Sequence, residues 1–288
     1  MFDVAEKPSS PGHEQAMVRY DWGSTTVYAS KRDPRFSYVL YVPSEVATPG
    51  NDVELVVAIH GTRRQFTQYR DAFVPFGRWN RCMVLCPLFP VGVCGDDNRS
   101  GYKRLVEGDI RYDEVLLDMV TEVGERYGKH FNQFALFGYS GGGQYVHRFA
   151  YVHPERLWAA SIGAPGTVTV LDHSKDWWLG MGGFERHFGK SFDPAALRRV
   201  PVQMVVGKAD IETWEITVRE DSPQYVPGIN DAGATRLERL RTLKASFEAA
   251  GIPVRLDELD NVAHNGMQVL ETVQDFLAQT LRTIRAAG

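Results

Sequence analysis

The sequence has few cysteines, no long apolar run and no dense cluster of basic residues. Its 288 residues include three cysteines, an odd and sparse set that favours reduced thiols over a disulfide framework. No apolar run approaches the roughly 20 residues that a membrane-spanning helix needs, so no membrane partner is expected. The formal net charge is −4 and no Lys/Arg patch is present, so the chain is not expected to bind nucleic acid.

The first residues of the chain and its cysteines indicate the cellular compartment of the protein. Residues 1–7 include acidic side chains and no apolar stretch, so they do not resemble a secretory signal; with few cysteines, this predicts a cytoplasmic protein. Cys82 and Cys86 are expected to be buried thiols, with a Cys86–Cys94 disulfide as an alternative. Metal-binding patterns such as H-E-x-x-H do not occur, so neither a metal nor another cofactor is expected.

Apolar runs typical of buried strands alternate with segments of helical periodicity along most of the chain. Two β-rich runs, 25–29 and 36–43, are expected to pair antiparallel. The later strands are expected at 54–59, 83–85, 134–137, 158–163, 202–207 and 254–259, and the main helices at 66–79, 111–127, 236–250 and 266–285. This alternation predicts an α/β fold with a mostly parallel central sheet of about eight strands and helices on both faces.

The chain length and its 43% hydrophobic content suit one large core, so residues 1–288 are predicted to form a single domain. Residues 1–23 are polar and aperiodic, as in a surface arm. Two segments, 166–199 and 208–235, interrupt the alternation after strand ends. The first is predicted to be a small lid insertion, because such insertions build substrate pockets on the active-site side.

A G-x-S-x-G pattern at 138–142 is the most informative motif. It lies between the expected strand 134–137 and a helix-like segment, which is the context that gives the motif its mechanical meaning. The glycines on either side of Ser140 allow a sharp turn that exposes the hydroxyl above the sheet. We therefore predict that Ser140 is a nucleophile. The alternative is an ordinary serine in a glycine-rich turn of a chain with 27 glycines.

A serine hydroxyl needs a base, and the base needs an orienting acid. His264 follows the last expected strand and Asp210 follows the strand 202–207, so a parallel sheet would bring both loops to the edge that carries Ser140. Other acids could replace Asp210: Glu212, Glu215 and, less readily, Asp172. The remaining histidines with an assigned expectation are His60, which would order its loop, His147 and His153, which would be structural, and His173 and His187, which could contact substrate.

The expected oxyanion hole consists of two backbone N–H donors aimed at the developing negative charge. Gly141, the residue after the nucleophile, would supply one donor. The loop after the strand 54–59 would supply the other, from Thr62 or, as second choice, Arg63. Glycine at position 61 permits this loop to approach closely.

These features together resemble the α/β-hydrolase superfamily over about residues 25–285: the motif 138–142, the His60-Gly61 turn and the positions of Asp210 and His264. Residues 38–43, and 141–144 followed by 153–156, are similar to esterases of the polyhydroxybutyrate-depolymerase and feruloyl-esterase type. The resemblance implies a serine hydrolase. We expect hydrolysis of a small carboxylic ester through an acyl-enzyme; amide or carbamate hydrolysis by the same triad, and a non-catalytic binding protein, are the alternatives.

Several side chains are expected to form the substrate pocket. Arg63 and Arg64 could pair with a substrate carboxylate, or could be a solvated basic loop or a salt bridge to Asp71. Aromatic residues of the two insertions could line the pocket or form a satellite core. The expected pocket residues are Arg64, Tyr139, Trp177, Trp178 and Trp214.

Overall fold

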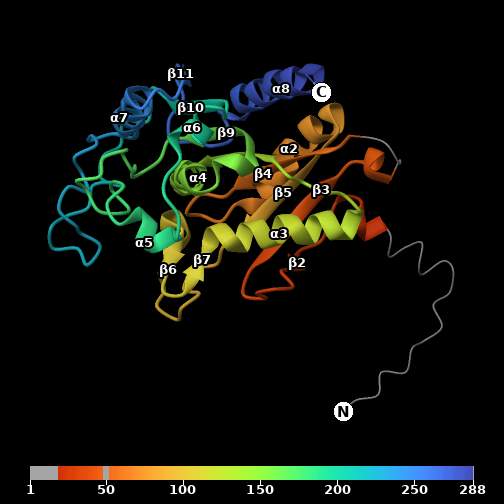
Figure 1. Ribbon diagram of the computed structural model, residues 1–288, viewed down its shortest axis with the longest axis horizontal. Helices are drawn as coiled ribbons and strands as arrows, with labels where there is room; N and C mark the ends of the chain where they lie inside the picture. Colours follow the sequence, from red (N-terminus) through yellow and green to blue (C-terminus); the bar gives the residue numbers. More distant parts are fainter. Residues whose placement is uncertain (1–18, 48–51, 288) are drawn as a thin grey trace, which may run out of the picture.

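A nine-stranded sheet forms the centre of the computed structural model, which describes residues 19–47 and 52–287 (Figure 1). The strand order is β1-β3-β5-β4-β8-β9-β10-β11, and β2 pairs with β3. The strands are β1 (Gly23–Ser24), β2 (Tyr28–Ala29), β3 (Ser37–Val42), β4 (Glu54–Ile59), β5 (Cys82–Leu88), β8 (Phe134–Tyr139), β9 (Leu157–Gly163), β10 (Val202–Gly207) and β11 (Val254–Leu259). A separate hairpin joins β6 (Val106–Glu107) to β7 (Ile110–Arg111).

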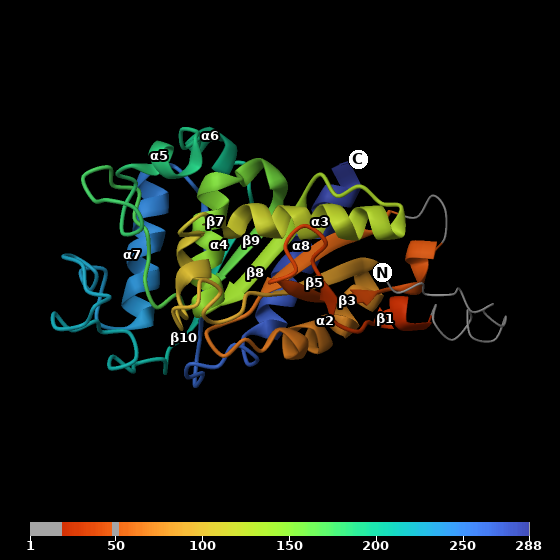
Figure 2. The same cartoon turned by 90° about the horizontal axis from the view of Figure 1, so that it is seen from below.

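The sheet is parallel from β5 to β11 and antiparallel only at the end that holds β1, β2 and β3. The α-helices are α2 (Phe66–Asn80), α3 (Tyr112–Tyr127), α4 (Gly141–Val152), α5 (Phe184–Phe188), α6 (Pro194–Leu197), α7 (Arg236–Ala249) and α8 (Leu270–Ala287). Helices α3 and α4 cover one face and α2 and α8 the other (Figure 2). The predicted fold, a mostly parallel sheet with helices on both faces, is confirmed.

Burial follows from this arrangement. Strands between two helical layers need apolar side chains on both faces, and every residue of β8, β9 and β10 is buried. Cys82 and Cys86 are buried and Cys94 is exposed. All three thiols are free, so the alternative disulfide between Cys86 and Cys94 is not formed. Among the described residues, no helix has both the length and the apolar character to cross a bilayer.

Local hydrogen bonding sets where the last two helices begin. At α7, the Thr235 hydroxyl accepts the Glu238 N–H and the Glu238 carboxylate accepts the Thr235 N–H, a capping box. The closing helix was expected from residue 266 but begins at Leu270. The Asn265 side chain accepts the Met267 N–H and its carbonyl accepts the Gln268 N–H, so the chain turns here before the helix can start.

The parts of the chain outside the alternating core differ from one another. Residues 1–18 of the expected surface arm lie outside the described residues. Its last part forms a 3-10 turn, Arg19–Asp21, and then β1, whose Gly23 pairs with Val42 of β3. Segments 166–199 and 208–235 extend from the same end of the molecule in both views (Figures 1 and 2). That end carries the carboxyl termini of the parallel strands.

Candidate active site

Ser140 occupies a strained turn between β8 and α4. Its φ of 59° and ψ of −114° lie in a region that residues with a side chain rarely adopt. The Ser140 N–H donates to the Gly163 carbonyl at 2.8 Å, and a Cβ on Gly142 would collide with the Ile59 carbonyl oxygen. This close contact therefore requires glycine at position 142, two residues after Ser140. Ser140 stands at the carboxyl end of β8, in the strand–turn–helix context expected from the motif.

His264 and Asp210 meet across two loops that follow β11 and β10. The His264 Nδ1 lies 2.6 Å from Asp210 Oδ2, and Asp210 is only 1% exposed. The other carboxylate oxygen, Oδ1, accepts a hydrogen bond from Arg236 Nη1 at 3.0 Å. Arg236 is itself buried, so the carboxylate is held from two sides. An imidazole that donates from Nδ1 to this carboxylate leaves Nε2 as the basic nitrogen.

The other candidate acids have different partners. Glu212 accepts a hydrogen bond from the Trp214 indole at 2.7 Å. Glu215 accepts one from Arg236 Nη2 at 2.6 Å, so it lies on the far side of the guanidinium that holds Asp210. Asp172 caps its own turn through Ser174. Of these acids, the structure brings Asp210 to His264.

Tyr139 connects the histidine loop to the nucleophile turn. Its ring centroid lies 5.1 Å from that of His264, and a Cβ on Gly266 would lie 3.1 Å from the same tyrosine ring. Tyr139 is buried, and burial raises the pKa of its phenol far above the usual range. Tyr139 therefore packs against His264, one residue before Ser140, and its place in a substrate pocket stays a prediction.

The amide of Thr62 lies next to Gly141, as an oxyanion hole would require. The position that a Cβ atom on Gly141 would take is 3.2 Å from the Thr62 nitrogen. His60 orders this loop: its Nε2 accepts the Phe89 N–H at 3.0 Å, so its Nδ1–H donates to the Gly61 carbonyl at 2.8 Å. Complete burial lowers the pKa of His60 to about 3, so the ring is neutral.

The two arginines of this loop differ from the expectation. Arg64 has a φ of 55°, and its guanidinium donates to the carbonyls of Thr62, Phe89 and Arg99 at 2.7–3.1 Å. Each guanidinium nitrogen thus donates to a backbone carbonyl, and the role of Arg64 in a substrate pocket stays a prediction. Arg63 is exposed. The alternative salt bridge to Asp71 is made by Arg70 instead, at 2.6 Å.

The three tryptophans have three different environments. Trp177 packs edge-on against Phe184 and Phe188, so it belongs to a satellite core. Trp178 lies between two guanidinium groups and lines a cavity near α4. Trp214 is 72% exposed, and its indole N–H donates to Glu212.

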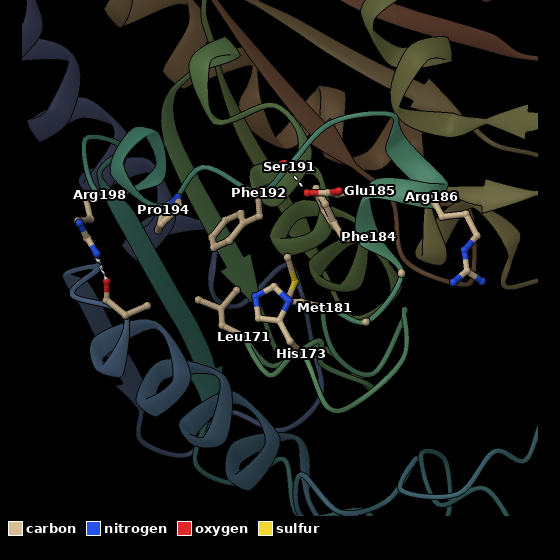
Figure 3. A pocket seen from close by; sticks show the side chains of 13 residues that line it. Leu171, His173, Met181, Phe184, Glu185, Arg186, Ser191, Phe192, Pro194 and Arg198 are labelled. Carbon is tan, nitrogen blue, oxygen red and sulfur yellow. Dashed lines mark hydrogen bonds between the residues drawn. The ribbon is translucent and has the colours of Figure 1, made fainter.

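Two cavities border segments that follow the parallel strands. The larger, of about 790 Å³, is lined by residues drawn from the segment 171–198, among them His173 and Met181, and by Ala250 (Figure 3). Ser140, Asp210 and His264 are not among its lining residues. The smaller, of about 130 Å³, borders Gln144, which is one turn along α4 from the nucleophile. The expected lid segment therefore builds a cavity of its own, apart from the triad.

A lysine that the sequence analysis missed lies beside Gly141, the residue after Ser140. Lys103 belongs to the 3-10 turn η3 (Gly101–Arg104), and its Cε is 3.0 Å from the position of a Cβ on Gly141. The side chain is 9% exposed and its ammonium donates to the Ser100 hydroxyl at 3.2 Å. No motif surrounds it; the adjacent basic pair Lys103-Arg104 was the one available signal.

The other buried histidines lie in structural networks. His147 Nε2 accepts the Thr169 N–H, and its Nδ1 bonds to the Gly143 carbonyl. His153 bonds to Asp113, and with Glu114 they form the one group of possible metal ligands found in the described residues. Arg111 already binds Asp113 at 2.6 Å, so this group is an ion-pair network at the start of α3, apart from Ser140.

Comparison with known proteins identifies the fold. No family model and no curated protein matches the sequence. Among solved structures, a poly(aspartic acid) hydrolase-1 from a Sphingomonas species is 21% identical, with a TM-score of 0.68 over 83% of this chain and 92% of that one. A poly(3-hydroxybutyrate) depolymerase from Bordetella parapertussis is 20% identical, with a TM-score of 0.70 over 88% and 89%.

A third solved structure is similar over a comparable length. An S-formylglutathione hydrolase from Agrobacterium tumefaciens is 18% identical, with a TM-score of 0.58 over 90% of this chain and 95% of that one. Identities this low carry information on the fold alone. The strand order, the helical layers and these matches show that the chain has the α/β-hydrolase fold.

Proposed function

We propose that the protein is a serine hydrolase that cleaves a small carboxylic ester through an acyl-enzyme on Ser140. The observation that carries this proposal is the strained Ser140 turn beside the Asp210–His264 hydrogen bond of 2.6 Å. Strained backbone at a functional serine is costly and persists only when the surrounding structure holds it. Two of the similar solved structures, the poly(aspartic acid) hydrolase-1 and the S-formylglutathione hydrolase, are hydrolases, which agrees with it.

In the proposed reaction, His264 Nε2 takes the proton of the Ser140 hydroxyl as Oγ attacks the acyl carbon. Asp210 stabilises the imidazolium and fixes the tautomer, while Arg236 fixes Asp210. The C–O bond to the leaving group breaks when the tetrahedral intermediate collapses, and His264 returns the proton to the departing oxygen. Water then repeats these steps on the acyl-enzyme.

The N–H groups of Gly141 and Thr62 are the proposed oxyanion donors. They are close neighbours, and the Arg64 hydrogen bonds hold the Thr62 carbonyl, which keeps this short loop in place. A preorganised donor of this kind contributes a few kcal/mol to lowering the barrier.

Amide hydrolysis by the same triad is the second candidate. One of the similar structures is named a poly(aspartic acid) hydrolase, and amino acid residues in such a polymer are joined by amide bonds. The two reactions differ in the leaving group, which must be protonated earlier for an amine than for an alcohol. Paired aryl esters and anilides with the same acyl group distinguish them.

A fluorophosphonate probe tests the proposed nucleophile. The wild-type protein is expected to give a covalent adduct that maps to Ser140 and to hydrolyse short aryl esters. Ser140→Ala, checked for folding by circular dichroism, is expected to give no adduct and to lose ester hydrolysis. A folded wild-type protein that neither reacts with the probe nor cleaves any ester would leave only the binding-protein alternative.

We also propose a cytoplasmic location. The three free thiols, two of them buried, are suited to a reducing compartment. Fractionation of cells with an antibody to the protein checks this.

A further inference from the structure

The smaller cavity is built next to the proposed nucleophile. Its walls come from η3, from the first turn of α4, from the loop after β9 and from the segment that follows Asp210. Lys103, Arg104 and Gln144 are among its lining residues. The Gln144 N–H donates to the Ser140 carbonyl at 3.1 Å, so this part of the cavity wall is tied to the turn that carries Ser140.

This cavity has an excess of positive charge. In the described part of the chain, neither Lys103 nor Arg104 makes an ion pair within 4.0 Å, and the same is true of Arg148 directly behind them. The carboxylate that lines the cavity, Glu215, is held by Arg236 at 2.6 Å. Glu107 attracts Arg104 from a greater distance.

Arg148 positions the wall that carries these groups. It is completely buried, and its guanidinium donates to the Lys103 carbonyl at 2.5 Å and to the hydroxyls of Thr169 and Thr167 at 2.8 and 3.2 Å. The Trp178 ring lies between Arg104, at 4.2 Å, and Arg148, at 5.5 Å. Stacking on Trp178 orients the planar Arg104 guanidinium at the cavity.

An anionic ligand would stabilise positive charges that are crowded together and shielded from water in this way. Burial and the neighbouring Arg64, Arg104 and Arg148 lower the pKa of Lys103 to about 7. An ammonium held at such a cost binds a carboxylate more strongly than an exposed lysine does, because the ligand supplies the charge compensation that the protein lacks.

The position of the cavity relative to Ser140 indicates which part of the substrate the cavity binds. Lys103 Cε lies beside Gly141, a proposed oxyanion donor. The leaving group must lie by His264, which protonates it and does not line this cavity, so the acyl chain is the part of the substrate that can extend toward the cavity. We propose that the cavity binds a carboxylate on the acyl part of the substrate through the Lys103 ammonium and the Arg104 guanidinium. This inference rests on the proposed ester hydrolysis at Ser140.

The test compares esters that differ in charge at the end of the acyl chain. The mono-4-nitrobenzyl ester of glutaric acid carries a carboxylate, and 4-nitrobenzyl hexanoate is neutral and of similar length. We expect wild-type kcat/KM to favour the glutarate ester by roughly a hundredfold, as two charge-assisted contacts of about tenfold each would give. Lys103→Met and Arg104→Met are expected to lower this ratio by about tenfold each while changing kcat/KM for hexanoate less than about threefold.

Two controls separate charge from folding and from position. Lys31→Met removes an exposed charge at a distant surface pair with Glu125 and is expected to leave the ratio unchanged. In the unaltered protein, 4-carboxybenzyl hexanoate, which has its carboxylate on the leaving group, is expected to gain nothing over the 4-nitrobenzyl ester. This comparison remains valid even if the Lys103 and Arg104 variants fail to fold.

A wild-type ratio at or below one overturns the proposed subsite, and so does a preference for the 4-carboxybenzyl ester. Equal losses for both acyl chains in folded variants overturn it as well. Failure of the proposed function has a different signature, because neither the glutarate nor the hexanoate ester would then be cleaved and no fluorophosphonate adduct would form on Ser140.

Discussion

Two basic pairs border the proposed nucleophile, and they differ in what their charges contact. Arg64, beside the His60-Gly61 turn, donates to three backbone carbonyls, while Arg63 is exposed. Lys103 and Arg104 come from a turn far along the chain, yet they line the cavity next to Gly141. Proximity to a motif in the sequence pointed to the first pair, whereas the second pair is brought to the cavity by the packing of η3 against α4.

The largest expected effect concerns a group that neither pair touches. Asp210→Asn is expected to lower kcat by roughly a thousandfold or more for charged and neutral esters alike, because an amide no longer holds the correct His264 tautomer. Steady-state rates for the glutarate and hexanoate esters measure this. If the two losses differ, the charged subsite is coupled to the triad, and the two basic pairs no longer act independently of it.

Arg148→Met is expected to have the next largest effect, and only on the Lys103–Arg104 side. The substitution leaves several buried oxygen acceptors without a donor, which costs about 3 kcal/mol of unfolding free energy in all. Urea unfolding measures this loss. The surviving folded fraction is expected to lose its preference for the glutarate ester, since the wall that carries Lys103 is no longer held. A stable variant with the full preference would contradict this role.

The Arg64 side gives a smaller and uniform effect. Arg64→Met removes hydrogen bonds that fix the proposed oxyanion loop, so we expect kcat/KM to fall roughly tenfold for both esters. Arg63→Met alters a side chain exposed to solvent and is expected to cost less than Arg64→Met on either ester. A selective loss for the glutarate ester in either variant would return the carboxylate site to this loop.

The smallest expected effect is on pH dependence. Lys103, with a pKa of about 7, is protonated below that value and neutral above it. The ratio of kcat/KM for glutarate over hexanoate is therefore expected to fall severalfold from pH 6 to pH 8, and then to level off because Arg104 stays charged. Arg64 and Arg148 face the same ammonium and also stay charged, and Glu215 is held by Arg236.

His264 acts on both esters in the same way, so the ratio removes its contribution. Lys103→Met is expected to flatten the pH dependence of the ratio. A ratio that stays constant in the wild-type protein would mean that the ammonium is not the group that binds the carboxylate.

Much of the fold was predictable because strands buried between two helical layers have continuous apolar runs. The bounds of β10 and β11 were predicted to the residue, and those of α2, α3 and α7 within one residue at each end. The start of α8 was not, because side-chain bonding by Asn265 competes with the helix. Residue type alone also failed to predict the burial of Trp214, an aromatic residue that was expected in a pocket and is 72% exposed.

The sequence by itself determined the tight turn at Ser140 and the order of strand ends, because these depend on local chemistry: glycines where the backbone is tight, and apolar runs that end at polar loops. Only the tertiary structure decided which acid meets His264 and which basic residues reach the cavity. Asp210 is selected by the paired ends of β10 and β11, and Lys103 by the contacts of Arg148 across η3, α4 and the loop after β9. Such contacts join residues far apart in the chain, and no local pattern of residues encodes them.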